Sequence, residues 1–175
     1  MSRRKSLILI LSLAVICLPA ALFAEGQKGG VRPCRTSDLI GTWEMKNISA
    51  KIKLDFKDSF GWPYQRYAFD RRGDVKEMTS TTPIESDKAK VKKFDNAAST
   101  SKFTINERGI LSISKIESPN PETCMCSYAT KDVPEEILAK IPAAKRAQIP
   151  HKGDIVLTYV NSNSQPVLIK SFRRV

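Results

Sequence analysis

Apolar and polar residues alternate along most of this chain, in short stretches separated by turn residues. The clearest example is residues 50–56, where Ile52, Leu54 and Phe56 share one face and lysine and aspartate occupy the other. Alternation with a period of two is typical of a strand with one buried and one solvated face. The pattern therefore predicts a mainly β protein.

The alternating stretches and the turns between them predict eight or nine short strands. Gly73 and Gly109 each follow polar residues, at positions where a hairpin turn needs a positive φ. Residues 83–101 are polar and lysine-rich, and we expect a long loop or an irregular edge there. Short strands at such spacing are typical of a barrel or a sandwich. The predicted strands are residues 42–49, 50–56, 64–69, 74–82, 102–106, 110–116, 123–130, 155–160 and 167–174.

One segment before the last two predicted strands has a helical pattern. Residues 132–136 place a proline and then two acidic residues where a helix begins, which suits the helix N-terminus. Pro142 interrupts the segment, so two short helices are predicted, at about 134–141 and 143–148. The first would bury an apolar stripe of Ile137, Leu138 and Ile141.

The N-terminus has the pattern of a secretory signal peptide. Residues 3–5 are basic and residues 7–18 form an apolar run, shorter than the about 20 residues of a membrane-spanning helix. Cleavage is expected after Ala24, which predicts a periplasmic or extracellular protein. Lipidation at Cys17 and twin-arginine export are the alternatives, but Ile16 stands where a lipoprotein signal wants a small residue.

The chain after the export segment has the length of one domain. We expect residues 1–24 to be the signal peptide, residues 25–37 a flexible leader and residues 38–175 a single barrel domain. The whole chain carries 29 Lys and Arg against 18 Asp and Glu, but these charges are mixed along it. No nucleic-acid surface is therefore predicted, although weak contact with an anionic envelope surface is compatible with the charge. The sequence does not determine the oligomeric state.

Three cysteines follow the export segment, and an oxidising compartment favours a disulfide. Cys124 and Cys126 lie two apart on one predicted strand, so a bridge between them would be strained. Cys34 is therefore expected to pair with Cys124 or Cys126, which would stabilise the fold by roughly 4 to 5 kcal/mol. The third thiol would be a small buried side chain, an intermolecular partner or part of a metal site. Three thiols without a nearby histidine make a poor zinc site, so no metal is predicted.

No catalytic constellation is visible in the sequence. His151 is the only histidine and lies in a predicted turn between Pro150 and Lys152. There is no Gly-x-Ser-x-Gly elbow and no glycine-rich phosphate loop. We therefore expect a protein that is not an enzyme and that has no cofactor.

Gly41-Thr42-Trp43 at the first strand, with Arg173 and Arg174 on the last, resembles the bacterial lipocalin-like group of the calycin superfamily. The resemblance implies one antiparallel up-and-down β-barrel of about eight strands. It also implies that Gly41, Trp43 and one of the two arginines form the closed floor, with the guanidinium on the indole face. Two features depart from the family: its Thr-Asp-Tyr motif is absent, and the helices precede the last two strands.

Two functions fit such a barrel. The first is binding of a small hydrophobic or amphiphilic ligand in the interior. The second is a filled barrel that acts as an envelope interaction or assembly module, with Trp62, Tyr64 and the lysines of residues 88–93 as contacts. Candidate cavity residues, which would equally fill a core, are Ile52, Leu54, Phe56, Tyr67, Phe69, Phe103, Ile105, Leu111, Tyr128, Leu157 and Tyr159.

Overall fold

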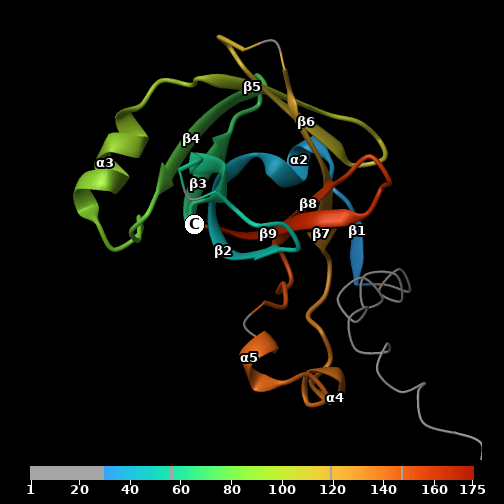
Figure 1. The fold of residues 1–175 in the computed structure, drawn as a ribbon. Helices are drawn as coiled ribbons and strands as arrows, with labels where there is room; N and C mark the ends of the chain where they lie inside the picture. The colour runs from blue at the N-terminus through green and yellow to red at the C-terminus, as the bar shows by residue number, and fades with distance from the viewer. Residues whose placement is uncertain (1–29, 56, 119, 147) are drawn as a thin grey trace, which may run out of the picture.

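The structure is a computed structural model that describes residues 30–175, apart from residues 56, 119 and 147. Its main feature is a closed antiparallel barrel of eight strands (Figure 1). The predicted signal peptide, the beginning of the predicted leader and the cavity candidate Phe56 lie outside the described residues. The barrel strands are β2 (Gly41–Ala50), β3 (Tyr64–Phe69), β4 (Asp74–Ser80), β5 (Ser101–Ile105), β6 (Ile110–Lys115), β7 (Glu122–Ala129), β8 (Ile155–Val160) and β9 (Pro166–Arg174).

The strands follow an up-and-down order. Each pairs with the next along the chain, and β9 returns to pair with β2 from Trp43 opposite Arg174 to Ala50 opposite Leu168. The closure leaves no free edge within the ring, which removes the main liability of a β-sheet. The predicted fold class, a single up-and-down barrel with a helical insert before the last two strands, is confirmed.

The two predicted glycine turns form as hairpins. Gly73 has φ +82° and Gly109 has φ +74°. At Gly109 a Cβ would approach the Cys126 carbonyl oxygen to 2.7 Å, so a side chain cannot be accommodated without a shift. Asp70 and Asn106 start the turns and accept backbone hydrogen bonds within them. Local turn chemistry thus fixes the register of two strand pairs.

A ninth strand lies outside the closed ring. β1 (Val31–Pro33) pairs with β7, and α2 (Thr36–Leu39) follows it. Residues 31–37, which we expected to belong to a flexible leader, are therefore part of the fold. The reason is that Cys34 is fixed to β7, by a backbone hydrogen bond of 3.0 Å to the Cys126 carbonyl and by a disulfide described below.

The strand predicted at residues 50–56 does not form. β2 extends to Ala50, and residues 51–55 are irregular although their side chains alternate. Their last pairing is a hydrogen bond from Lys51 N to Val167 O, because β9 begins at Pro166 and offers no further partner. Ile52 is consequently 50% exposed, and it is not a cavity residue. Leu54 is half-buried against the core.

The segment predicted as a loop at residues 83–101 contains a helix. α3 (Lys88–Asn96) begins at Asp87, whose side chain accepts hydrogen bonds from Ala89 N and Lys90 N. Phe94 anchors it on the outside of the barrel, 5.8 Å from the Arg66 guanidinium. Figure 1 shows α3 beside the ring of strands. The Phe94 ring, the Asp87 cap and hydrogen bonds from Lys90 to Ser80 and Thr82 therefore hold a helix in which four of the nine residues are lysine.

The predicted helical insert consists of two short helices, as Pro142 indicated. α4 (Glu135–Leu138) and α5 (Ala143–Arg146) are both shorter than expected. No residue of α4 is buried, and Ile137 is 41% exposed, so the predicted apolar stripe does not pack. In Figure 1 both helices extend away from the barrel on the β7–β8 connection.

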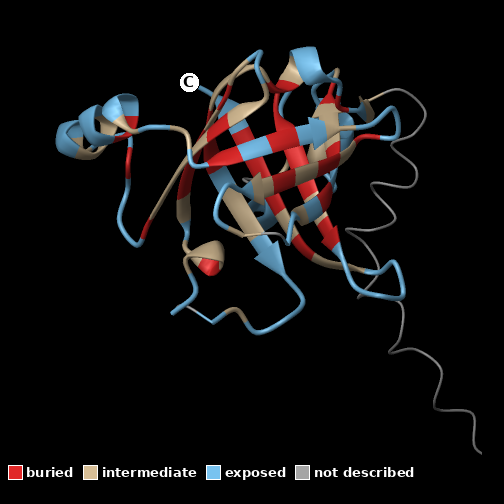
Figure 2. Ribbon diagram, turned by 90° about the horizontal axis from the view of Figure 1, so that it is seen from above, coloured by how far each residue is buried: buried red, intermediate tan, exposed pale blue. Residues whose placement is uncertain are grey.

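The buried core lies inside the ring of strands (Figure 2). Three ring contacts run through it: Tyr67 to Phe69 at 6.0 Å, Tyr67 to Phe172 at 5.4 Å and Phe69 to Phe103 at 5.1 Å between centroids. These rings fill the part of the barrel nearest to Trp43. Side chains of a different kind occupy the opposite end.

Candidate binding site at the barrel mouth

The two ends of the barrel differ in chemistry. We call the end that contains Trp43 and α2 the floor, and the opposite end the mouth. The strand registers place the starts of β3, β7 and β9 and the end of β8 at the mouth. Residues 51–63 connect β2 to β3 there, and we call them the mouth segment.

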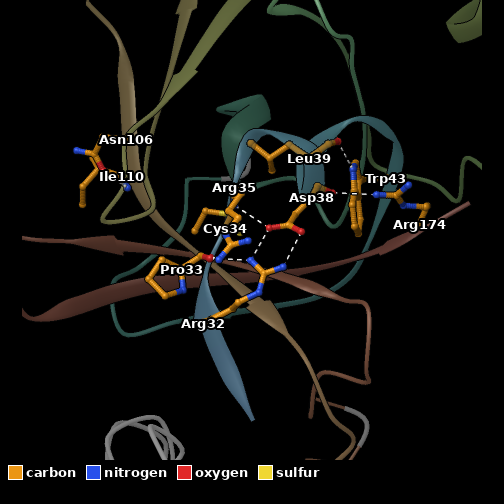
Figure 3. The surroundings of a disulfide bond; sticks show 11 residues. Arg32, Pro33, Cys34, Arg35, Asp38, Leu39, Trp43, Asn106, Ile110 and Arg174 are labelled. Atoms are coloured by element: carbon orange, nitrogen blue, oxygen red, sulfur yellow. Dashed lines mark hydrogen bonds and ion pairs between the residues drawn. A yellow bond between two sulfur atoms is a disulfide. The ribbon is translucent and has the colours of Figure 1, made fainter. Parts of the chain in front are cut away.

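At the floor, Trp43 is fully buried and held on two sides (Figure 3). Its Nε1 donates a hydrogen bond to the Leu39 carbonyl of α2, at 2.6 Å. The Arg174 guanidinium lies 4.9 Å from its ring centroid and donates to the Asp38 carbonyl at 2.9 Å. Trp43 and α2 thus form one plug.

The other two predicted floor residues have separate roles. Gly41 has φ +130°, and a Cβ there would lie 3.5 Å from Arg174 Nη1. This backbone conformation favours glycine. Arg173 does not reach Trp43, because its guanidinium forms a two-pronged ion pair with Asp154 at 2.8 and 2.9 Å.

The three cysteines of the described residues form one disulfide and leave one free thiol. Cys34 pairs with Cys126, with their Cα atoms 5.4 Å apart, and Cys124 is free and buried. Burial raises the pKa of the Cys124 thiol to about 12. Of the three expectations for the leftover thiol, a small buried side chain is the one observed. Among the described residues, no group of His, Cys, Asp and Glu side chains is arranged to hold a metal.

An ion pair fixes β1 beside the plug. Arg32 donates to both carboxylate oxygens of Asp38, at 2.6 and 2.7 Å (Figure 3). Hydrogen bonding to Arg32 lowers the pKa of Asp38 below its usual value. Arg32 also lies 4.8 Å from the ring centroid of Tyr128. Tyr128, one of the cavity candidates, is thereby placed at the floor.

The barrel brings the remaining cavity candidates together at its core. Ile105 is only partly buried at the edge of the core. Tyr159 alone lies at the mouth among polar groups. Fully or nearly buried in the core are Tyr67, Phe69, Phe103, Leu111, Leu157 and Tyr159.

Lys170 is the unexpected residue of the mouth. Its side chain points into the barrel from β9, on the same face of the strand as Leu168 and Phe172. It has no exposed surface. Its Nζ donates to Gln65 Oε1 at 3.1 Å and lies 3.5 Å from the Phe60 ring centroid. Desolvation lowers the pKa of Lys170 to about 8.

No carboxylate neutralises this ammonium directly. Within the described part of the chain, none of the ion pairs shorter than 4.0 Å involves Lys170. Glu122 and Glu77 act on it from a greater distance and favour its charged form. Glu122 accepts a short hydrogen bond from the Tyr159 hydroxyl. Burial raises the pKa of Glu77.

The mouth segment lies over this cluster. Its short 3₁₀ helix η2 (Ser59–Gly61) begins at Asp58, which accepts a hydrogen bond from Phe60 N. The Phe60 ring packs edge-on against Tyr159 at 5.1 Å. Gln65 Nε2 donates to the carbonyls of Phe60 and Trp62, at 2.8 and 3.1 Å. Gln65 therefore links the mouth segment to Lys170.

A solvent-open hollow adjoins this segment, lined by Lys53, Leu54, Asp55 and Lys57. Sequence reasoning missed Lys170, Gln65 and Glu122 because it selected apolar residues for the interior, and it missed Phe60 because this residue lies between two predicted strands. The sequence nevertheless indicates that Lys170 points inward. It is two residues from Leu168 and two from Phe172, so the three side chains lie on the same face of the strand.

Comparison with known proteins gives no family: no family model, curated protein or solved structure matches the chain. Within the described residues, no helix has both the length and the apolar character needed to cross a membrane.

Proposed function

We propose that this protein is an exported, lipocalin-like binding protein that takes a small amphiphilic ligand into the mouth half of its barrel. The observation that carries the proposal is Lys170, a fully buried ammonium whose hydrogen-bond partner is the neutral Gln65 and which has no ion pair shorter than 4.0 Å among the described residues. An ammonium can donate three hydrogen bonds, so two donors remain for a ligand. Burying such a charge costs free energy that a barrel filled only for stability would avoid.

The composition of the mouth supports a ligand with both apolar and polar parts. Phe60 and Tyr159 supply aromatic surface, whereas Lys170, Gln65 and Glu122 supply polar groups. Binding sites typically combine mostly apolar walls with a few polar groups that set the ligand's orientation. Perturbed pKa values in one enclosed place are also typical of functional sites.

Three further features support the lipocalin-like and exported parts of the proposal. The Arg174 guanidinium on Trp43, next to Gly41, has the arrangement that the family resemblance implies for the floor. The Cys34–Cys126 disulfide fits an oxidising compartment. A cleavable N-terminal segment is the expected route to that compartment.

Titration with the apolar fluorophore N-phenyl-1-naphthylamine tests the proposal. We expect saturable binding at one site, and a several-fold weaker affinity for Phe60→Leu, which removes the ring over the mouth. Ile137→Ala, on an exposed residue of α4, is the matched control and should bind like the wild type. Native mass spectrometry of gently purified protein should also show a co-purifying small molecule. Absence of saturable binding, together with a bare chain mass in repeated preparations, would refute the proposal.

The packed floor half of the barrel favours the second function, an interaction or assembly module without a small ligand. The rings there pack against one another, Tyr67 on Phe69 and Phe172, and Phe69 on Phe103. The half-buried Trp62 and Tyr64 and the lysines of α3 would then be the contact surface. A bare mass combined with a stable complex in envelope extracts would favour this function.

A further inference from the structure

Among the described residues, Lys170 combines three properties that no other lysine shares. It has no exposed surface, it lies beside two aromatic rings, and it forms no ion pair shorter than 4.0 Å. The Phe60 centroid lies 3.5 Å away and the Tyr159 centroid 5.3 Å away. An amine in such a place is partly desolvated, and its lone pair becomes available at a lower pH than that of a surface lysine. Buried lysines of this kind are nucleophiles toward carbonyl groups.

The acidic residues around Lys170 favour a ligand with a neutral carbonyl group over a ligand with a carboxylate. Glu122, Glu77 and Asp58 all act on it, and each would repel a ligand carboxylate placed beside the amine. A neutral carbonyl group is not repelled in this way. The mouth thus fits an apolar molecule with an aldehyde group better than a fatty acid.

The residues beside Lys170 can also handle protons. The Tyr159 hydroxyl and the Glu122 carboxylate share a short hydrogen bond on the same side of the barrel. Glu77, a half-buried residue of β4, has a pKa that desolvation raises. Imine formation needs a proton removed from nitrogen and a proton delivered to the departing oxygen, and these groups provide both.

We propose that Lys170 forms a reversible imine with the aldehyde group of a small apolar ligand. The neutral amine attacks the carbonyl carbon, a carbon–nitrogen bond forms, and the carbonyl electron pair moves to oxygen, which takes up a proton as the nitrogen releases its first one. The carbinolamine hydroxyl then takes up a second proton and leaves as water, the carbon–oxygen bond breaks, and the nitrogen releases its second proton as the carbon–nitrogen double bond forms. No oxidant or reductant is consumed. The inference rests on the proposed binding function and specifies the ligand class for the same site.

Access to Lys170 requires the mouth segment to move. Phe60 covers Nζ, and the Gln65 hydrogen bonds and the Phe60–Tyr159 contact hold it there. These contacts are noncovalent, so an entering aldehyde can displace the ring. The displaced phenyl ring would then pack against the ligand.

Cinnamaldehyde with sodium cyanoborohydride, at pH 7 and a low molar excess, tests the inference. The reductant converts an imine to a stable amine, and peptide mapping by mass spectrometry locates it. We expect Lys170 of the wild type to be labelled at least about tenfold faster than the average exposed lysine, because its neutral fraction at pH 7 is roughly two hundred times larger. Lys170→Met should lose this adduct, and Lys88→Met, at an exposed position of α3, should retain it.

The outcomes separate this inference from the proposed function. Labelling confined to exposed lysines, with saturable N-phenyl-1-naphthylamine binding, would overturn the imine and leave the binding function intact. Failure of both measurements would overturn both. Because the mapping is done on the wild type, the result does not depend on whether Lys170→Met folds. Cinnamyl alcohol, which lacks the carbonyl group, should compete with the fluorophore without giving any adduct.

Discussion

Arg174 and Trp43, near opposite ends of the folded chain, are direct register partners on β9 and β2, and their side chains stack at 4.9 Å. The same guanidinium donates to the Asp38 carbonyl of α2. One arginine thus joins the last strand, the first barrel strand and the helix of the plug. Its contribution to stability can be measured directly.

Replacing Arg174 with Met should lower the free energy of unfolding by about 1 kcal/mol, since it removes the cation–π contact and keeps an apolar side chain. Urea denaturation followed by tryptophan fluorescence measures this change. Arg71→Met, at an exposed position of the β3–β4 turn, is the control and should be neutral. Equal stability of the two variants would show that the stacking contributes nothing.

The Cys34–Cys126 bridge joins residues 92 apart in the sequence. The double variant Cys34→Ser, Cys126→Ser should therefore lose about 4 kcal/mol of stability, because the unfolded chain regains the freedom of a long loop. The measurement is urea denaturation of this variant beside the wild type, with and without dithiothreitol. Reduced wild type should resemble the variant. A difference below about 1 kcal/mol between oxidised and reduced protein would contradict the prediction.

Cys124 should be chemically inert in the folded protein. Its thiol is buried, and its pKa of about 12 leaves almost no thiolate at pH 8. We expect no reaction with Ellman's reagent under native conditions. After unfolding without reductant, we expect one reactive thiol per chain, not counting Cys17 of the export segment. Rapid native labelling would mean that the mouth half opens far more readily than its packing indicates.

Lys170 should make stability depend on pH in a specific direction. Its folded-state pKa of about 8 is below the ordinary value of 10.5, so the unfolded chain binds more protons between these values. Stability from this residue therefore rises with pH across that window. The stability of wild type relative to Lys170→Met should increase by about 2 kcal/mol from pH 7 to pH 10.

The difference between the two proteins is the informative quantity, because other groups titrate in the same range. Burial raises the pKa of Tyr67 and Tyr159, and both tyrosines are present in each protein. Glu122, Glu77 and Cys124 also face Lys170 and are likewise retained. If the stability difference between wild type and Lys170→Met does not change with pH, Lys170 is solvated or paired in solution.

Gln65→Leu should loosen the mouth segment, because Gln65 donates to two of its carbonyls. Hydrogen exchange at residues 57–63 should become faster, and stability should fall by about 1 to 3 kcal/mol as the Lys170 ammonium and the two carbonyls lose their partner. Lys53→Ala, at an exposed residue of the same segment, should change neither. Unchanged exchange in Gln65→Leu would show that other contacts hold the segment.

Most of the strands could be predicted from the sequence because their determinants are local. Alternation defines each strand, and Gly73 and Gly109 define two hairpins. The Cys34 bridge was narrowed to two partners by geometry alone, but the choice of Cys126 depends on how β1 docks on β7. Local patterns therefore predicted most strands and a barrel or sandwich, and the family resemblance favoured the up-and-down barrel. The docking of β1 on β7 decided the disulfide pairing.

The errors come from interactions between distant segments. Residues 50–56 alternate as a strand does, but pairing fails where β9 begins at Pro166. α3 depends on Phe94 finding a site on the outside of the barrel, which its lysine-rich sequence does not reveal. Lys170 was overlooked because a charged residue is not expected inside a barrel, although its position in the alternation places it there.

The plug at the floor is anchored at both of its ends. The Cys34–Cys126 disulfide holds the chain before α2, and β2 begins directly after it at Gly41. The mouth segment, by contrast, is longer and its described contacts are hydrogen bonds and ring packing. Thermal fluctuation should accordingly open the mouth more readily than the floor, because a covalent bond restrains only the floor.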